Sequence, residues 1–418
     1  MPDILNMPLD QASCQQLDRD DPLAFCRDRF DLPDGLIYLD GNSLGAMPSS
    51  MTEVMQQTLI NEWSGDLIQS WNKAGWARLS QTLGDQLGSL IGANQGQIVV
   101  CDTTSSNLYK AIRAACDLRP ERPVIVTQRD NFPTDLYIIE GAMTGVDREL
   151  RCDIVAQQDI LNSIDNQVAV VVLSHVNYKS GEILPVREIT EAAHQAGALV
   201  IWDLCHSAGV IPVELDSWEV DFAVGCTYKY LNAGPGAPAY IYVSSRHIEQ
   251  TRQPLSGWWG HADPFAFEDE FRPATDISRF LCGTQPVLAL KGVACGLDTY
   301  TGVSLLHIRE KSIALCELFI RLLSQECADS DLLLHGPDVG EQRGSQVSVR
   351  FEHGYALMQA LIEQGVVGDF RAPDLMRFGF APLYIRYEDI WIAVQALKTC
   401  LQNKTWQLEK YQNRMAVT

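Results

Sequence analysis

The stretch VAVVVLSHVNYKSGEILPVREITEAAHQAGALVIWDLC, residues 168–205, decides the fold. It begins with VAVVVLSHV and ends with ALVIWDLC, two short segments too apolar to have a solvent-exposed face. Between them, VREITEAAHQAG has the pattern of a helix. Short apolar strands that alternate with helices indicate a parallel sheet covered on both sides. The sequence therefore predicts an α/β protein, and QIVVCD and PVIVTQ upstream are expected to be further strands of the same sheet.

The chain of 418 residues is too long for one ordinary compact core. We expect an N-terminal arm and the start of a small domain in residues 1–60, and a large domain in 61–300. After about residue 300, a long helix (roughly 301–325) and short strands such as SQVSVRF and LMRFGF alternate with two more helices. Residues 301–418 should therefore form a smaller C-terminal α+β domain.

Two helices are expected before the first strand of the sheet. Residues Met55, Leu59, Trp63 and Leu67 recur at a spacing of four, and we expect Trp63 to lie in the core. The second helix begins near Trp76 and should end at Gly92, because glycine commonly terminates helices.

Composition narrows the possible partners. The balance of 32 Lys and Arg against 53 Asp and Glu gives a net charge of −21, which repels nucleic acid and anionic membranes. An anionic substrate must then be held by a local cation. The twelve cysteines form no Cys-x-x-Cys pair and the eight histidines no His-Glu-x-x-His, so we expect reduced thiols and no metal site. No apolar run is long enough for a membrane helix and the N-terminus lacks a secretory pattern, which favours a cytoplasmic protein.

Chemically useful residues follow several of the predicted strands. Thr104 and Ser105 open a helix after QIVVCD, and NFPTD, which contains Phe132 and Thr134, follows PVIVTQ. Asp203 ends ALVIWD, and Lys229 lies in FAVGCTYKYLNAGPG. Ligands of open parallel sheets bind at the carboxyl ends of the strands, so these residues should lie near one another.

This set of residues matches the needs of pyridoxal phosphate. A lysine forms a Schiff base with its aldehyde, a carboxylate keeps its pyridine nitrogen protonated, and hydroxyls at a helix start hold one phosphate. No glycine-rich dinucleotide motif or Walker lysine competes with this interpretation. Singly, each residue has a simpler explanation: Lys229 as a surface lysine, Asp203 as a strand-end residue, Thr104 and Ser105 as a helix cap. Their joint order favours the cofactor.

Five motifs then occur in a characteristic order: LDGNSLG, NFPTD, VIWDLCHSAG, CTYKYLNAGPG and GWWGH. In this, the chain resembles the kynureninase family, within the aminotransferase-like (fold-type I) pyridoxal phosphate enzymes. The resemblance implies hydrolysis of L-kynurenine to anthranilate and L-alanine in tryptophan catabolism or NAD biosynthesis, with 3-hydroxykynurenine as a secondary substrate. It also implies a homodimer.

The resemblance assigns roles to individual residues. It implies Lys229, Tyr228 and Asp203 as catalytic, with Lys229 as the Schiff-base lysine. The residues implied to bind the cofactor are Thr104, Ser105, Phe132, Thr134, Asp135, Ser174, Asp203, His206, Tyr228, Lys229, Trp258 and Thr284. Of these, Trp258 and Thr284 are expected to come from the neighbouring subunit.

The substrate contacts implied by the resemblance are Ser43, Trp71, Trp258, Gly283 and Arg377. Arg377 would clamp the substrate α-carboxylate, since a guanidinium fork suits that group, and Arg371 is its rival. Trp71 and Trp258 would sandwich the aromatic side chain. The apolar Trp71 and small Thr284 suggest a preference for kynurenine over its hydroxylated form.

Two alternatives remain. Another reaction on the same scaffold is possible, such as that of an aminotransferase or a cysteine desulfurase. A desulfurase needs a reactive cysteine on a mobile loop, and only Cys282 is near a plausible loop, whereas Cys205 and Cys226 neighbour cofactor positions. A non-catalytic binding module is disfavoured, because both Asp203 and Lys229 are kept and no basic segment is appended.

Overall fold

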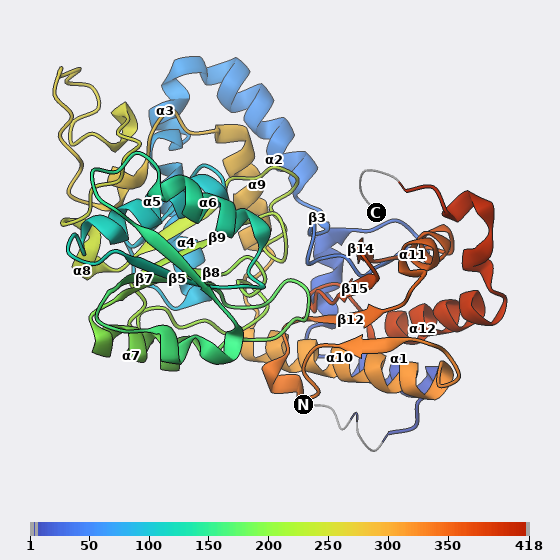
Figure 1. Ribbon diagram of the computed structural model, residues 1–418. Helices are drawn as coiled ribbons and strands as arrows, with labels where there is room; N and C mark the ends of the chain where they lie inside the picture. The colour runs from blue at the N-terminus through green and yellow to red at the C-terminus, as the bar shows by residue number, and fades with distance from the viewer. Residues whose placement is uncertain (1–3, 5–6, 415–418) are drawn as a thin grey trace.

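The computed structural model describes residue 4 and residues 7–414, so the two ends of the predicted arm and C-terminal domain (1–3, 5–6 and 415–418) lie outside the described residues. Figure 1 shows a larger part built on a central sheet and a smaller part that contains both the start and the end of the chain. Within the described residues, no helix has the length and apolar character needed to cross a membrane.

A mixed sheet of seven strands forms the centre of the larger part, in the order β4-β10-β9-β8-β7-β5-β6. The strands are β4 (Ile98–Val100), β5 (Val124–Gln128), β6 (Arg151–Val155), β7 (Val168–Ser174), β8 (Leu199–Asp203), β9 (Phe222–Gly225) and β10 (Tyr240–Val243). The expected strands are confirmed. All run in one direction except β10, which is antiparallel to both β9 and β4. The expectation of an α/β fold with a mostly parallel sheet covered by helices is confirmed, and β10 is the exception because a loop rather than a crossover helix joins it to β9.

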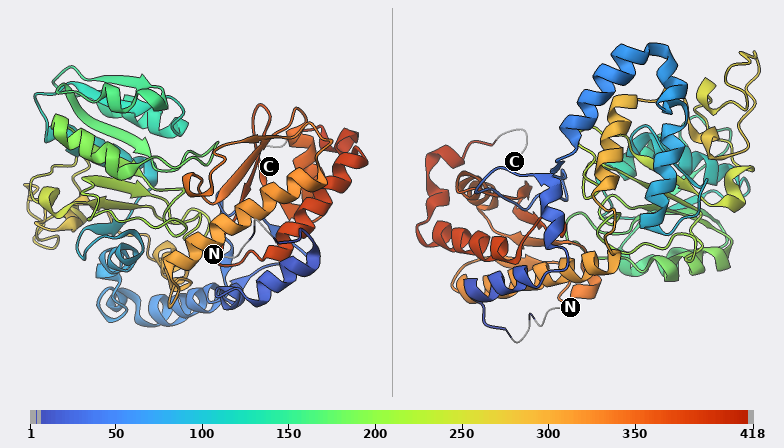
Figure 2. Two further views of the ribbon diagram at one scale, coloured as in Figure 1. Left: turned by 90° about the horizontal axis from the view of Figure 1, so that it is seen from below. Right: turned by 180° about the vertical axis from the view of Figure 1, so that it is seen from behind.

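Helices cover both faces of this sheet (Figure 2). Side chains alternate along β7 and β8, so that Val170, Val172 and Ile201 share one core with α5 and α6, and Val171 and Trp202 share the other. The helices of the first face are α5 (Thr104–Asp117) and α6 (Pro133–Met143), and those of the second are α4 (Leu79–Ile91), α7 (Val186–Ala196) and α9 (Val287–Asp298). Gly92 ends α4 in the left-handed conformation, as predicted.

The region of the first predicted helix is less regular. It comprises α2 (Met51–Gln57), wide π-helical turns over Thr58–Asp66, and the short α3 (Ser70–Lys73), and it projects beyond the sheet in Figure 1. Trp63 is 55% exposed, so its expected place in the core is wrong. The four-residue spacing marks an apolar face but does not say what covers it, and here that face points out of the single chain.

The smaller part contains a second sheet of order β11-β12-β15-β14, all antiparallel. Its elements are α10 (Leu305–Glu326), β11 (Leu333–His335), β12 (Gln346–Arg350), α11 (Gly354–Glu363), β14 (Asp369–Arg371), β15 (Leu375–Gly379) and α12 (Tyr387–Gln402). The N-terminal segment joins it, because α1 (Gln11–Arg19) packs on α12 and β2 (Ile37–Tyr38) pairs with β13 (Val366–Val367). Two strands, β1 (Phe30–Asp31) and β3 (Met47–Pro48), pair with each other, and α8 (Ser245–Ile248) follows β10.

Candidate functional site

The carboxyl ends of β4, β5, β7, β8 and β9 meet at one edge of the large sheet, because these strands share a direction. Ser174 at the end of β7 stands in register with Asp203 at the end of β8. Lys229 follows β9, and α5 and α6 begin shortly after β4 and β5. The topology thus brings the predicted strand-end residues to a common edge.

Lys229 lies against a buried histidine. Its Nζ is 2.9 Å from Nε2 of His206, a residue the sequence also singled out. Burial and the charge of Lys229 lower the pKa of His206 well below its usual range, so the imidazole is neutral and accepts a hydrogen bond from the ammonium. The other ring nitrogen, Nδ1, is buried and has no hydrogen-bond partner among the described residues. That atom is free to meet a ligand.

Two buried carboxyls, Asp203 and Asp135, face each other beside Lys229. Asp203 is fixed by the backbone N–H of Cys205, which donates to Oδ1 at 2.7 Å. Burial and the charge of Asp203 raise the pKa of Asp135 well above its usual range, which favours the neutral form of this carboxyl. Its Oδ2 is buried without a hydrogen-bond partner in the described chain. The protonated pyridine nitrogen of pyridoxal phosphate needs a carboxylate as its hydrogen-bond acceptor, and Asp203 and the free Oδ2 of Asp135 offer such acceptors. These residues therefore fit pyridoxal phosphate.

The start of α5 forms the next wall. Thr103, not Thr104, is the cap, and its hydroxyl accepts from the Ser106 N–H at 3.2 Å. The hydroxyl of Thr104 lies 3.7 Å from the Sγ of Cys205, which ties the helix start to the loop after β8. Thr104 and Ser105 lie in the first turn of α5, whose N–H groups lack intrahelical acceptors and favour an anion.

Tyr228 precedes the lysine and is half-buried. Burial, together with the nearby thiols of Cys226 and Cys205 and the carboxylate of Asp203, raises the pKa of its hydroxyl. Tyr228 is therefore protonated near neutral pH and can donate a hydrogen bond.

Asn131 organises the wall formed by α6, and sequence analysis did not single it out. Its Oδ1 accepts from the Ser174 hydroxyl at 2.7 Å and from the Phe132 N–H at 2.8 Å. The Phe132 ring is 40% exposed and meets the Tyr178 ring edge-on at 5.1 Å. Thr134 lies in the first turn of α6. The motif NFPTD contained this signal, because an asparagine after a strand often orders the following turn.

Arg377 comes to the site from the smaller part of the chain. It is only 2% exposed, and its Nε donates to Oδ1 of Asp369 at 2.7 Å, while Nη2 bonds the other oxygen. Nη1 donates to the carbonyl of Tyr178 at 2.7 Å, and Nη2 to the Ser43 hydroxyl at 3.2 Å. Arg371 also donates to Asp369, at 2.8 Å, but is much more exposed. Sequence analysis missed Asp369, which orients both arginines.

The LDGNSLG motif contains Ser43 and positions it beside Arg377. The Gly45 N–H donates to the Tyr228 carbonyl at 2.8 Å. A Cβ on Gly45 would lie 2.3 Å from the carbonyl oxygen of Lys229, so glycine is required for this close approach.

The remaining predicted residues lie elsewhere. Trp258 is 39% exposed, and Gly283 and Thr284 are exposed as well. Within the described chain, no hydrogen bond joins any of these three residues to Lys229. Trp71 and Trp258 both pack on Trp259, with ring centroids 5.1 and 4.7 Å away. In the single chain, Trp259 is therefore the common partner of the two rings expected to sandwich the substrate.

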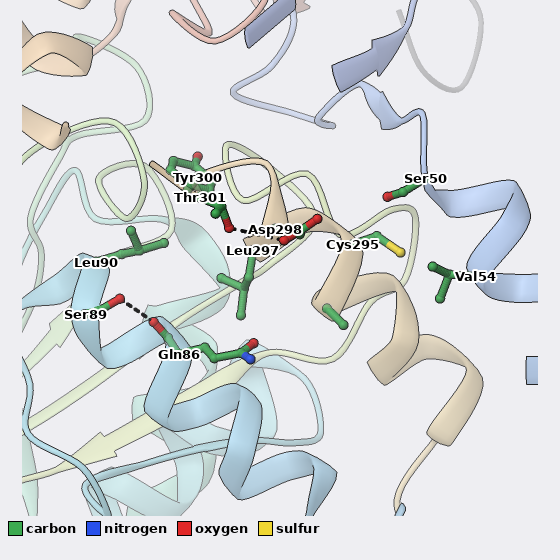
Figure 3. A pocket seen from close by; sticks show the side chains of 11 residues that line it. Ser50, Val54, Gln86, Ser89, Leu90, Cys295, Leu297, Asp298, Tyr300 and Thr301 are labelled. Atoms are coloured by element: carbon green, nitrogen blue, oxygen red, sulfur yellow. Dashed lines mark hydrogen bonds between the residues drawn. The ribbon is translucent and has the colours of Figure 1, made fainter. Parts of the chain in front are cut away.

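A separate cavity of about 460 Å³ lies between α2, α4 and α9, and Figure 3 shows Ser50, Cys295 and Asp298 among its lining side chains. None of the predicted site residues lines it. The described residues also contain no group of three or more His, Cys, Asp or Glu side chains arranged to hold a metal ion.

Comparison with known proteins supports one family. Residues 308–397 match the model of the kynureninase C-terminal domain. Over 407 residues, the chain is 48% identical to a kynureninase of Burkholderia pseudomallei (strain 1106a), with 96% of this chain and 98% of the relative covered. A kynureninase of Pseudomonas fluorescens is 48% identical over 410 residues, covering 97% and 99%. The chain belongs to the kynureninase family.

Solved structures of lower identity agree on the fold. A cysteine desulfurase from Thermococcus onnurineus NA1 has a TM-score of 0.78 at 18% identity and covers 91% of this chain and 98% of its own. The cystine C-S lyase C-DES has a TM-score of 0.76 at 17% identity, covering 87% and 98%. A C-DES variant with glycine linked to its pyridoxal phosphate cofactor has a TM-score of 0.76 at 16% identity, covering 89% and 98%. These similarities confirm for this chain the aminotransferase-like fold predicted from the sequence.

Proposed function

We propose that this chain hydrolyses L-kynurenine to anthranilate and L-alanine, with pyridoxal phosphate as its cofactor. Membership of the kynureninase family is the first support. The observation that carries the proposal is the grouping at one sheet edge of Lys229 on neutral His206 and of Asp203 beside the buried Asp135, whose pKa is raised. Cofactor binding is assigned to the residues of this edge.

The bound cofactor supplies an electron sink that allows the bonds at the substrate Cα and Cβ to be broken. Lys229 would hold the cofactor covalently, and its Nζ would move the proton at the substrate Cα. Asp203 would accept a hydrogen bond from the pyridine nitrogen and keep it protonated. Asp135 would lie beside this contact, and Phe132 would pack against the cofactor.

Thr104 and Ser105 would bind the cofactor phosphate through the start of α5, and Tyr228 would donate a hydrogen bond to it. The hydroxyl of Tyr228 is protonated and lies next to Lys229 in the chain, so we also assign it as the donor of the proton that the substrate Cβ takes up when water cleaves the bond between Cβ and the side-chain carbonyl carbon. Ser174 acts indirectly, because its hydroxyl donates a hydrogen bond to Asn131 and so fixes the residue that precedes Phe132.

Arg377 binds the substrate α-carboxylate with Ser43. Asp369 and the Tyr178 carbonyl hold its guanidinium in one orientation, which lowers the entropy cost of binding. The charges of Arg377 and Arg371 both lower the pKa of His206, so both guanidinium groups lie near the Lys229 site. We assign the clamp to Arg377, because Arg371 is the more exposed of the two.

A homodimer is part of the proposal, with Trp258 and Thr284 completing the neighbouring site and Gly283 and Trp71 contacting the substrate. Large apolar side chains gather on two exposed segments, which suits a face covered by a second copy: Leu59, Ile60, Trp63, Leu67, Ile68, Leu255, Trp258, Phe265, Phe267 and Phe271.

We also propose kynurenine as the preferred substrate over its hydroxylated form. The proposed compartment is the cytoplasm, because the twelve cysteines are free thiols.

The first test is purified protein with added pyridoxal phosphate and L-kynurenine, followed by anthranilate fluorescence and assay of alanine. Equal amounts of both products are expected. If kynurenine is untouched while cysteine yields alanine and persulfide, the desulfurase alternative replaces the proposal. Turnover of 3-hydroxykynurenine above that of kynurenine would reverse the substrate preference.

Shared sites are tested by mixing two inactive variants, Lys229→Ala and Trp258→Ala. If Trp258 acts across the dimer, random exchange of subunits restores about one quarter of wild-type turnover, because each mixed dimer has one intact site. If Trp258 acts within its own chain, no mixed dimer has an intact site and no activity returns.

A further inference from the structure

A second cavity, of about 620 Å³, lies where the large sheet and its helix α7 meet α10. Its walls include Val186 and Glu188 from the start of α7, Ile211, Trp218, and Arg309 from α10. None of the residues assigned above to cofactor or substrate lines it. The size is that of a small-molecule site.

Arg309 is a buried cation on this cavity, 9% exposed. Its Nη2 donates to the carbonyls of Gly340 and Glu341, at 3.0 and 3.1 Å. Its Nη1 is buried and has no hydrogen-bond partner among the described residues. No ion pair of Arg309 occurs in that part of the chain, and the carboxylate of Glu341 acts on it only through space. A buried guanidinium without an anion carries a desolvation cost that a bound carboxylate would offset.

The start of α7 is a second feature of this cavity that favours a negatively charged group. Pro185 occupies the N-cap position of α7, but its side chain accepts no hydrogen bond. The N–H groups of the first turn of α7 are therefore left without a side-chain acceptor at the cap. Val186, Arg187 and Glu188 of that turn line the cavity. An uncapped helix start and a buried guanidinium both favour a negative group.

His175 and Trp218 form an aromatic wall. Their rings meet edge-on with centroids 6.1 Å apart, and His175 also meets Trp202 at 6.4 Å. Burial, with the charge of Arg309, lowers the pKa of His175 to about 4, so its ring is neutral. Its Nδ1 is buried without a hydrogen-bond partner in the described residues. Apolar side chains, among them Ile183 and Ile211, complete the wall.

Acidic groups at the rim limit the ligand's charge. Glu188, Glu191 and Glu341 line the cavity, and only Glu191 is held by a cation there, with Arg187 at 2.8 Å. A second negative charge on the ligand would meet these carboxylates.

We propose that this cavity is a second ligand site, which binds a small aromatic monocarboxylate through Arg309 and the start of α7. The ring lies against Trp218 and His175. Because the lining comes from both parts of the chain, a bound ligand holds α10 against α7. The site also touches the catalytic edge, since the N–H of His175 donates to the Asp203 carbonyl at 2.9 Å.

The test uses the holoenzyme and para-fluorobenzoate, followed by fluorine NMR. We expect binding that Arg309→Gln weakens at least about tenfold, the value of one carboxylate contact. Arg321→Gln, on the same helix α10 but outside the cavity, should leave it unchanged. Para-fluorobenzyl alcohol, without a carboxylate, should bind no variant tightly.

Since Arg309 also holds the turn at Gly340, Trp218→Leu provides a variant without that role, and it should weaken the benzoate as well. Circular dichroism verifies that each variant is folded. Binding that survives both substitutions but is lost in Arg377→Gln would place the probe in the catalytic site and overturn the proposal. Absence of binding to the wild type would overturn it too.

Discussion

Replacing Arg377 by Gln separates the two roles of this side chain, in stability and in substrate binding. The substitution leaves Asp369, itself buried, without the two hydrogen bonds from Arg377. Breaking a buried ion pair from one side costs about 3–5 kcal/mol. Arg371 remains 2.8 Å from the same carboxylate, so we expect the lower end, about 3 kcal/mol.

The matched control is Arg371→Gln. Its side chain is nearly half exposed and makes one hydrogen bond to Asp369, so the free energy of unfolding should fall by less than about 1 kcal/mol. Urea unfolding measures both values.

The double variant Arg377→Gln with Asp369→Asn removes both charges. It should recover most of the lost stability, because no unpaired carboxylate stays buried. Its kcat/KM for kynurenine should stay at least about 100-fold below wild type, since a charge-assisted bidentate contact contributes about 3 kcal/mol. Anthranilate fluorescence measures that ratio.

Two outcomes would refute this reasoning. If Arg371→Gln lowers kcat/KM more than Arg377→Gln does, the carboxylate clamp is Arg371. If the double variant regains activity together with stability, Arg377 serves the fold and not the substrate.

Further predictions concern the cofactor edge and its surroundings. Lys229→Ala should abolish turnover and the visible absorption band of the bound cofactor together, and retained turnover would exclude Lys229 as the Schiff-base lysine. Asp135→Asn should keep kcat within about threefold because the raised pKa of Asp135 favours a neutral side chain, which an amide resembles, whereas Asp203→Asn should lose at least about 100-fold; equal losses in a kynurenine assay would contradict this assignment. Burial and the charge of Asp369 raise the pKa of Asp40 from 3.8 to about 7, so the stability that protonated Asp40 contributes is lost as pH rises from the first value to the second. Urea midpoints should therefore fall less in Asp40→Asn than in wild type between about pH 4 and 7, and parallel curves would argue against the raised pKa. Gly45→Ala should destabilise the protein by about 2 kcal/mol or more because its Cβ would meet the Lys229 carbonyl, and an unchanged thermal midpoint would refute that contact.

Much of the fold could be predicted because local pattern and core placement agree. The apolar runs that became β7 and β8 are buried on both faces, and only a covered parallel strand tolerates such a run. Strand β6 escaped prediction because it is an edge strand with a mixed, half-exposed pattern. Strand β10 escaped prediction because it has only four residues and follows a stretch rich in glycine and proline. Trp63 was misplaced for a related reason: spacing identifies an apolar face, not its partner.

For the site, the sequence by itself determined which side chains stand at strand ends, since that depends on neighbours along the chain. It therefore supplied Lys229, Asp203, His206 and the start of α5. Only the tertiary structure decided which groups from distant segments meet them. Asp369 is held by Arg377 across adjacent strands, and the pairing of Asp135 with Asp203 changes its protonation. The buried Arg309 could be recognised as a candidate ligand-binding residue only from the structure, because the cavity that it lines forms where α10 lies against α7. Burial and through-space charge depend on packing between segments far apart in the chain, and these determine the pKa values and the free hydrogen-bonding groups on which the chemistry depends.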